Sequence, residues 1–315
     1  MQNFPFQPFD DAWARAAETR ALREQRRKKR LIGLAVIGSV AALVAVAVVL
    51  LPRLGGDDPA SAVATTRPTS APTTTVDTSR VDLNHPYDGT PAASWFEGEA
   101  GIVLPAAAPV GRYSAEQVAY AMERAKLLIT LSRLNAYTIR YHDAEPALRL
   151  LAPIHAERDI RPLLVPGDEE KTWWLLERIH PDYELLPVKP RVNGSMTVAL
   201  NEEGDLVVHT DYLIAYAFHT DSPPQLTDYF EIISVVRDQI DYILVDDQKW
   251  TDDSQGMWIG AAKGFAYSVN CELGGEGFLA PNYSNPPSTY GGTPDTRSPE
   301  SYFDPTLPIA TGTDC

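Results

Sequence analysis

The stretch LVVHTDYLIAYAF, residues 206–218, alternates between apolar and more polar side chains, and the predicted fold depends on it. In an extended strand, residues two apart share a face, so the even-numbered residues from Leu206 to Phe218 form one side and the odd-numbered residues form the other. The even-numbered side is the more apolar one. We therefore expect it to face the helices, because a slip of one residue in register would turn that side to solvent.

The sequence on either side extends this strand into a meander of long antiparallel strands. Residues 196–200 and 206–218 flank a polar loop that contains Gly204, a pattern typical of a β-hairpin. Two further apolar runs follow, at residues 229–245 and 257–271. The first of these runs is too long to be flat, and we expect a bulge or a bend where the polar triplet at residues 237–239 interrupts it.

The sequence before the hairpin has helical patterns. Ser114 and Gln117 have the spacing of a capping box, and apolar residues recur at helical intervals from Val118 to about Leu134. Three shorter helical patterns follow, at residues 144–151, 154–164 and 168–179. Helices followed by an antiparallel meander predict an α+β domain in which helices pack on one face of a bent antiparallel sheet.

Two parts of the chain resemble known proteins. The run from Trp95 through GIVLP and VGRYSAEQV looks like a group of actinobacterial single-pass membrane proteins with an extracellular domain. The order and length of the expected elements between Ser114 and Cys271 resemble the NTF2-like superfamily, whose α+β domains are cone-shaped. An anchor followed by an exported domain of this kind is similar in topology to the VirB8-like subunits of conjugative secretion machines.

The NTF2-like resemblance also implies where a cavity would lie. Enzymes of that superfamily place an Asp, His or Tyr side chain inside the cone. By this resemblance, four residues of the central strand line the cavity, namely His209, Asp211, Tyr212 and Tyr216. A fold does not imply a function, however, and such residues also serve as core tyrosines or as exposed polar groups.

Residues 31–51, LIGLAVIGSVAALVAVAVVLL, contain no charged side chain and as a helix would cover roughly 30 Å, the thickness of the hydrocarbon core of a bilayer. Basic residues crowd the preceding flank, at residues 23–30. Because positively charged flanks stay in the cytoplasm, we expect a single-pass cell-membrane protein with a cytoplasmic N-terminus and an extracellular C-terminal domain. A cleaved signal peptide is the alternative, since residues 62–64 resemble a cleavage site, but its apolar region normally runs about 7 to 15 residues.

Charge is divided unevenly along the chain. The formal net charge of the 315 residues is −15, but residues 1–30 hold 8 Lys/Arg against 4 Asp/Glu, which leaves −19 for the remainder. An acidic exported region argues against binding to nucleic acid or anionic lipid headgroups and is compatible with basic partners. Residues 55–80 are rich in Thr and Pro, so we expect an extended linker that holds the following domain away from the membrane.

These features divide the chain into five parts. They are a cytoplasmic basic tail (1–30), a transmembrane helix (31–51), an extracellular Thr/Pro-rich linker (52–94), an NTF2-like α+β domain (95–271) and a Gly/Pro-rich tail (272–315). Cys271 and Cys315 both fall on the exported side, where an oxidising compartment favours one intramolecular disulfide. The cysteines lack the spacing of a zinc site, so we expect no metal and no cofactor, and we expect the tail to lie over the domain as a strap.

The sequence contains no GxSxG, HExxH, P-loop or dinucleotide-binding glycine motif, so we assign no catalytic residue. We expect a membrane-anchored envelope protein whose extracellular domain binds another protein, or a second copy of itself, as an assembly or scaffold subunit that serves secretion. The alternative is small-molecule binding or an enzymatic activity in the cone cavity. An open cavity with convergent polar groups would favour the alternative, and a filled cone would favour the scaffold.

Overall fold

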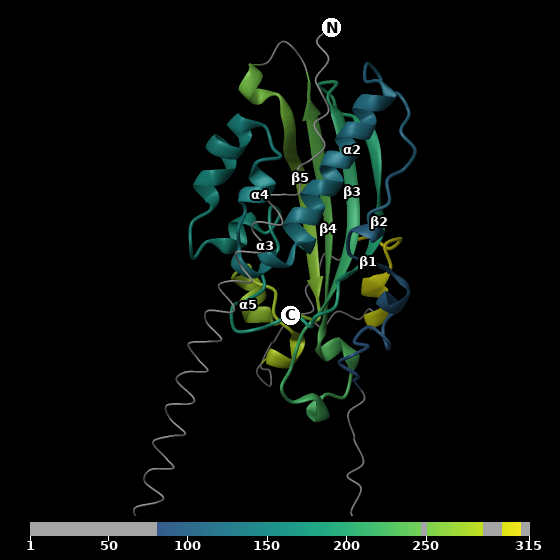
Figure 1. Ribbon diagram of the computed structural model, residues 1–315, viewed down its shortest axis with the longest axis vertical. Coiled ribbons are helices and arrows are strands. Elements are labelled where there is room, and N and C mark those ends of the chain that lie inside the picture. The colour runs from purple at the N-terminus through teal and green to yellow at the C-terminus, as the bar shows by residue number, and fades with distance from the viewer. Residues whose placement is uncertain (1–80, 247–250, 286–297, 310–315) are drawn as a thin grey trace, which may run out of the picture. The chain divides into compact units, whose positions relative to one another are not determined.

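The computed structural model describes residues 81–246, 251–285 and 298–309 (Figure 1). The predicted basic tail, the span at residues 31–51 and the Thr/Pro-rich sequence up to residue 80 lie outside these residues. Among the residues that are described, no helix has the length and apolar character needed to cross a membrane. The anchor and its orientation therefore stay predictions.

An antiparallel sheet of five strands, in the order β1-β2-β3-β4-β5, lies at the centre of the described residues. The strands are β1 (Phe96–Glu97), β2 (Arg191–Leu200), β3 (Leu206–Ala217), β4 (Ile233–Val245) and β5 (Gly256–Tyr267). The predicted hairpin is confirmed, because β2 and β3 pair up to Leu200 and Leu206, and the N–H of Asp205 donates to Oδ1 of Asn201 at 2.7 Å. Each strand pairs with the next in sequence, so the expected meander and the α+β class are confirmed.

The bulge predicted at residues 237–239 is wrong. The shift in register between β4 and β5 lies between Ile240 and Tyr242 instead. Arg237 and Asp238 stay in the regular ladder because their side chains point to opposite faces of the sheet, where each forms an ion pair. Charged side chains that look like an interruption in the sequence are therefore accommodated by ion pairs and leave the backbone regular.

Helices α2, α3 and α4 lie on one face of the sheet (Figure 1). The α-helices are α2 (Ala115–Ile129), α3 (Ala136–Tyr141), α4 (Glu145–Leu148) and α5 (Cys271–Gly275), and π-helical turns follow at Thr130–Leu134 and His155–Ile160. The capping box of α2 is confirmed, because the N–H of Gln117 donates to Oγ of Ser114 at 3.4 Å and the N–H of Ser114 donates to Oε1 of Gln117 at 2.9 Å. The apolar side of α2 packs on β3 and β4.

The helix predicted at residues 168–179 is wrong. Only a 3-10 turn, Glu169–Thr172, forms at the start of this segment, and the backbone then continues without a regular helix. The guanidinium of Arg178 donates to backbone carbonyl oxygens within the segment and to Oγ1 of Thr172 at 2.7 Å. The carbonyl oxygen of Thr172 also accepts the backbone N–H groups of Leu175 and Leu176, so backbone and side-chain donors share the carbonyl groups of this segment.

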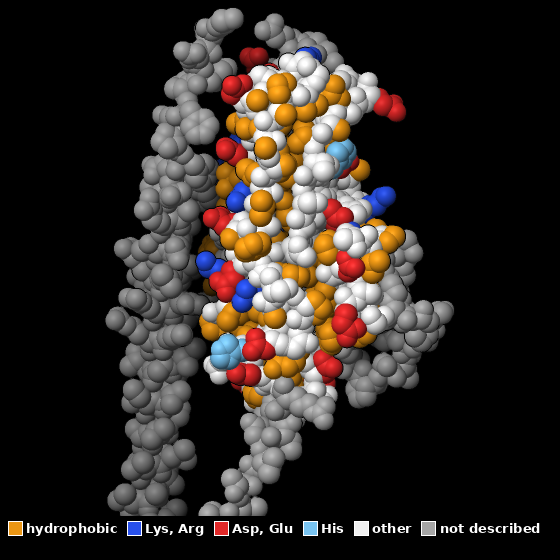
Figure 2. All heavy atoms as spheres, turned by 90° about the vertical axis from the view of Figure 1, so that its right-hand side faces the viewer, with side chains coloured by type: hydrophobic (Ala, Val, Ile, Leu, Met, Phe, Trp, Pro, Cys, Tyr) orange, Lys and Arg blue, Asp and Glu red, His pale blue; other side chains and the backbone are white. Residues whose placement is uncertain are grey.

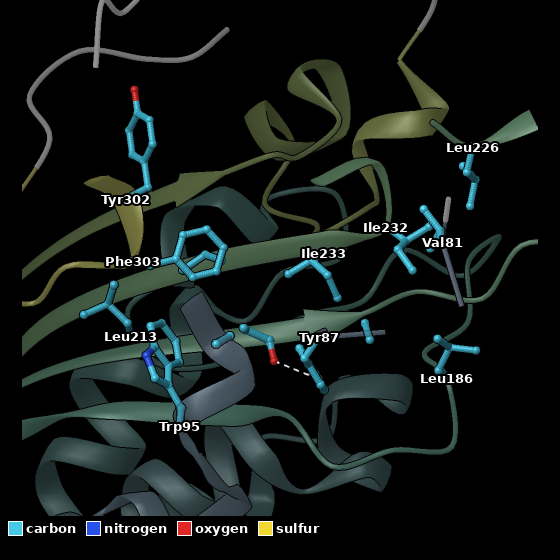
Figure 3. Close-up of a cluster of buried hydrophobic side chains, with 14 residues drawn as sticks. Val81, Tyr87, Trp95, Leu186, Leu213, Leu226, Ile232, Ile233, Tyr302 and Phe303 are labelled. Carbon is cyan, nitrogen blue, oxygen red and sulfur yellow. Dashed lines mark hydrogen bonds between the residues drawn. The ribbon is translucent and has the colours of Figure 1, made fainter. Parts of the chain in front are cut away.

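The opposite face of the sheet carries a second apolar core (Figure 3). Its buried members are Val81, Tyr87, Ala92, Trp95, Leu186, Leu213, Ala215, Ala217, Leu226, Ile232, Ile233, Val235, Tyr302 and Phe303. Residues 81–94, which composition assigns to the linker, therefore belong to the folded domain, because Tyr87 and its neighbours cover the odd-numbered side of β3. The even-numbered side faces the helices as expected, and Tyr216 donates from its hydroxyl to the carbonyl oxygen of Arg133 at 2.9 Å.

The described part of the C-terminal tail, residues 298–309, lies across this second core. The ring of Tyr302 stacks on that of Tyr267, with 3.9 Å between the centroids, and Arg237 donates to the carbonyl oxygens of Pro305 at 2.8 Å and Leu307 at 2.6 Å. This part of the tail is the strap that the sequence analysis expects. The predicted disulfide stays a prediction, because its second cysteine lies outside the described residues.

Candidate functional site

The four residues expected to line a cavity are divided between the two faces of the sheet. Tyr212 and Tyr216 are buried on the helix side, where burial raises the pKa of the Tyr212 hydroxyl to about 12. His209 is half exposed on the other side, and its Nδ1 lies 2.7 Å from Oδ1 of Asp241. Asp211 lies on that same side. The alternation of the strand thus separates the four side chains, and they do not form one site.

Asp211 serves the C-terminal strap. Its two carboxylate oxygens accept hydrogen bonds from Nε and Nη2 of Arg237 at 2.9 and 2.7 Å, and Oδ2 also accepts one from Gln239 at 2.9 Å. The remaining donors of Arg237 reach the strap carbonyls. A bidentate carboxylate–guanidinium pair fixes orientation as well as charge. The geometry assigns Asp211 a role in holding the strap rather than in chemistry.

A buried cluster of charged residues lies on the helix side, where the sequence analysis predicted none. Nε of Arg133 lies 3.1 Å from Oδ2 of Asp238, and Nη1 of Arg133 lies 3.9 Å from Oε2 of Glu177. Burial raises the pKa of Glu177 to about 7, although the Arg133 charge opposes the shift, and burial also raises the pKa of Asp238. One sequence signal was available: Asp238 shares its strand face with Val236 and Ile240, and a charge on an apolar face predicts a buried partner.

The charged cluster borders a cavity of about 300 Å³ between the sheet and α5, which we call the Asp238 cavity. Its lining is Arg133, Trp173, Leu176, Glu177, Val236, Asp238, Gly264, Phe265, Ala266, Val269, Gly274, Gly277, Phe278 and Leu279. A Cβ atom at Gly264 would lie 2.4 Å from the ring of Trp173, so the indole lies directly over this glycine. The absence of a side chain at Gly264 therefore lets the indole approach the strand next to Asp238.

An exposed apolar segment lies on another side of the domain. It runs along the outer edge of β2, since a Cβ at Gly101 would touch Val192 and one at Gly111 would touch Leu200. Residues 103–110, VLPAAAPV, together with Phe96 and Leu200, form what we call the apolar strip. Figure 2, which faces this side, shows hydrophobic side chains gathered along its length.

The backbone of the apolar strip is nearly extended. The ten steps from Gly101 to Gly111 cover the same path as the eight steps from Val192 to Leu200 in β2, roughly 27 Å. No backbone hydrogen bond joins residues 103–109 to any other described residue. Phe96 and Val103 leave 64% and 59% of their area exposed. The strip therefore presents exposed apolar side chains, and its residues 103–109 have backbone groups with no backbone hydrogen-bond partner among the described residues.

Comparison with protein-family models, with curated proteins and with solved structures finds no match to the chain. Among the described residues, no group of three or more His, Cys, Asp or Glu side chains is placed to hold a metal ion. Two features are thus candidates for function, the apolar strip and the Asp238 cavity, and each is inferred from its own geometry.

Proposed function

We propose that this chain is a single-pass membrane protein whose extracellular domain binds another protein of the cell envelope as an assembly or scaffold subunit. In this proposal residues 1–30 are cytoplasmic, residues 31–51 anchor the chain and the domain is an NTF2-like cone. The apolar span and its basic flank support the anchor. A tether that holds a binding module near membrane partners raises its effective concentration there.

The apolar strip is the observation that carries the binding proposal. Soluble domains seldom leave a contiguous run of apolar side chains exposed, and a larger exposed patch commonly marks a binding surface. Pro105 and Pro109 bracket three exposed alanines and limit the backbone freedom that binding would remove. A nearly extended segment with unused backbone groups is suited to recognition by a groove or a strand edge.

The charge of the domain indicates the chemistry of the partner. The remainder of the chain beyond residue 30 carries −19, so a second copy would bring a like charge to the interface. A groove with apolar walls and a rim of Lys or Arg would complement both the strip and the net negative charge of the chain beyond residue 30. We therefore favour a different protein over a second copy of this chain.

A pair of matched variants of the full chain tests the proposal by chemical crosslinking in cells. Val103 lies in the strip, and Val165 is an exposed valine elsewhere. Val103→Asp should remove the crosslinked adduct with the partner, because it places a carboxylate in an apolar contact, whereas Val165→Asp should leave the adduct unchanged. An adduct that persists in both variants would contradict the proposal. An adduct of the chain with itself alone would replace the partner by a second copy.

A further inference from the structure

The Asp238 cavity has more acceptors and negative charge than its own donors satisfy. Two carboxylates, Asp238 and Glu177, face one guanidinium, that of Arg133. Nη2 of Arg133 donates to the carbonyl oxygen of Trp174 at 3.1 Å, so part of its donor capacity is spent outside the cluster. Among the described residues, the one donor to Oε1 of Glu177 is the N–H of Arg178, at the long distance of 3.3 Å.

Asp238 is the clearest unsatisfied group. Its side chain is more than nine-tenths buried, and Oδ2 accepts no hydrogen bond from the described residues even though it lies 3.1 Å from Nε of Arg133. A buried carboxylate oxygen that accepts no hydrogen bond is costly, and a ligand that donates to Oδ2 would recover part of that cost. An anionic ligand would meet two carboxylates and find the guanidinium already engaged.

Aromatic groups complete the cavity wall. The indole of Trp173 lies over Gly264, next to Asp238, and Phe278 borders the cavity from the end of α5. Aromatic faces attract cations, and the attraction grows when the cation is removed from water. Carboxylates at one end and aromatic rings along the wall are the combination that suits an ammonium or guanidinium group attached to a short carbon chain.

We propose that the Asp238 cavity binds a small organic cation, with its charged head on the cavity side of the Asp238 and Glu177 carboxylates, away from Arg133, and its carbon chain against Trp173 and Phe278. The cavity volume of about 300 Å³ is at the lower end for small-molecule sites, so the ligand is compact. This site is separate from the apolar strip. A test of cation binding is therefore independent of the test of protein binding.

The cavity predicts how affinity varies with pH. Three groups from other elements face Glu177: Arg133 of the π-helical turn, Asp238 of β4 and Tyr216 of β3. Arg178 is its neighbour in sequence. Since the pKa of Glu177 is about 7, it is largely protonated at pH 6 and largely ionised at pH 8. A cation favours the ionised carboxylate, so affinity should rise about tenfold between these two pH values.

Isothermal titration calorimetry on the full chain in detergent micelles tests the proposal. The probes are n-butylammonium and agmatine, with n-butanol as the neutral control and butyrate as the anionic control. We expect binding of at least one cation, about tenfold tighter at pH 8 than at pH 6, and no binding of butyrate. Absence of binding by both cations, or binding of butyrate as tight as that of butylammonium, would overturn the proposal.

Two variants make the test specific to the cavity. Glu177→Gln preserves the shape of the side chain and should remove most of the pH dependence, whereas Glu276→Gln, on an exposed position near the cavity, should leave both affinity and pH dependence unchanged. Glu177→Gln is preferred to a change at Asp238, which would leave Arg133 without its nearest counter-ion. An unaltered tenfold pH dependence in Glu177→Gln would also overturn the assignment.

Discussion

Arg237 and Asp238 are neighbours in β4, and they carry opposite charges to opposite faces of the sheet. On the strap side, Arg237 reaches both oxygens of Asp211 and two backbone carbonyls, so its donors are well used. On the helix side, Asp238 has one ion pair with Arg133, and its Oδ2 accepts no hydrogen bond from the described residues. The difference indicates that the ion pair on the strap face stabilises the fold, whereas the helix face leaves a hydrogen-bond acceptor unsatisfied beside a cavity.

Aspartate substitutions at two consecutive positions of β3, one on each face of the sheet, give the largest expected losses of stability. Tyr216 is fully buried on the helix side, and Ala217 is buried in the second core. At position 216 a new carboxylate would meet Glu177 and Asp238, which already share the charge of Arg133, and at position 217 it would lie in the apolar second core. Tyr216→Asp and Ala217→Asp should therefore each lower the free energy of unfolding by more than about 4 kcal/mol. Urea unfolding followed by circular dichroism measures both. Near wild-type stability of Ala217→Asp would mean that the second core does not form in solution.

Removing one carboxylate from each face compares the two ion pairs directly. Asp238→Ala removes the nearer counter-ion of the buried Arg133 and leaves Glu177, at 3.9 Å. We expect the free energy of unfolding to fall by about 3 kcal/mol. Asp211→Ala should cost less, about 2 kcal/mol, because Asp211 is partly exposed and the strap carbonyls still accept from Arg237. Hydrogen exchange should speed up at residues 302–307 in Asp211→Ala only. Faster exchange there in Asp238→Ala, with no change in Asp211→Ala, would reverse the roles of the two faces.

The pH dependence of stability gives a smaller effect that is confined to the helix face. Glu177 has a pKa of about 7 in the folded chain, above its ordinary value of 4.5, so the folded state binds its proton more tightly than the unfolded state does. Its contribution is complete below about pH 4.5 and is lost as the pH rises towards 7. Glu177→Gln should remove about 2 kcal/mol from the change in unfolding free energy between pH 5 and pH 8. Identical pH profiles for the variant and the wild type would contradict the raised pKa.

Local sequence patterns correctly predict those elements that are determined by interactions between residues close in sequence. The strand at residues 206–218, its hairpin and the capping box at Ser114 each follow from alternation, loop chemistry or cap spacing within a few residues. The pattern at residues 168–179 predicts a helix on the same grounds, yet only the 3-10 turn Glu169–Thr172 forms there, and the Arg178 guanidinium donates to carbonyl groups of this segment. Residues 81–94 lack a periodic pattern, so their place in the second core was not predicted.

The candidate sites depend on contacts that are distant in sequence. The Asp238 cavity forms where the π-helical turn after α2, the irregular segment that contains Glu177, and β4 come together, and no single stretch of sequence predicts that contact. The NTF2-like resemblance placed a cavity among four residues of one strand, yet alternation puts His209 and Asp211 on the strap face. The apolar strip is visible in the sequence as VLPAAAPV, but the exposure that makes it a candidate follows only from the structure.

The central claim, that the apolar strip is the surface that binds a partner, is tested most directly by site-specific photo-crosslinking in cells. The photoreactive residue replaces Ala107, which is exposed in the strip, or Leu163, which is exposed outside it, in the full chain. We expect position 107 to yield a reproducible adduct with another envelope protein and position 163 to yield none. The claim is contradicted if position 107 gives no protein adduct, or if the same adduct forms equally from both positions.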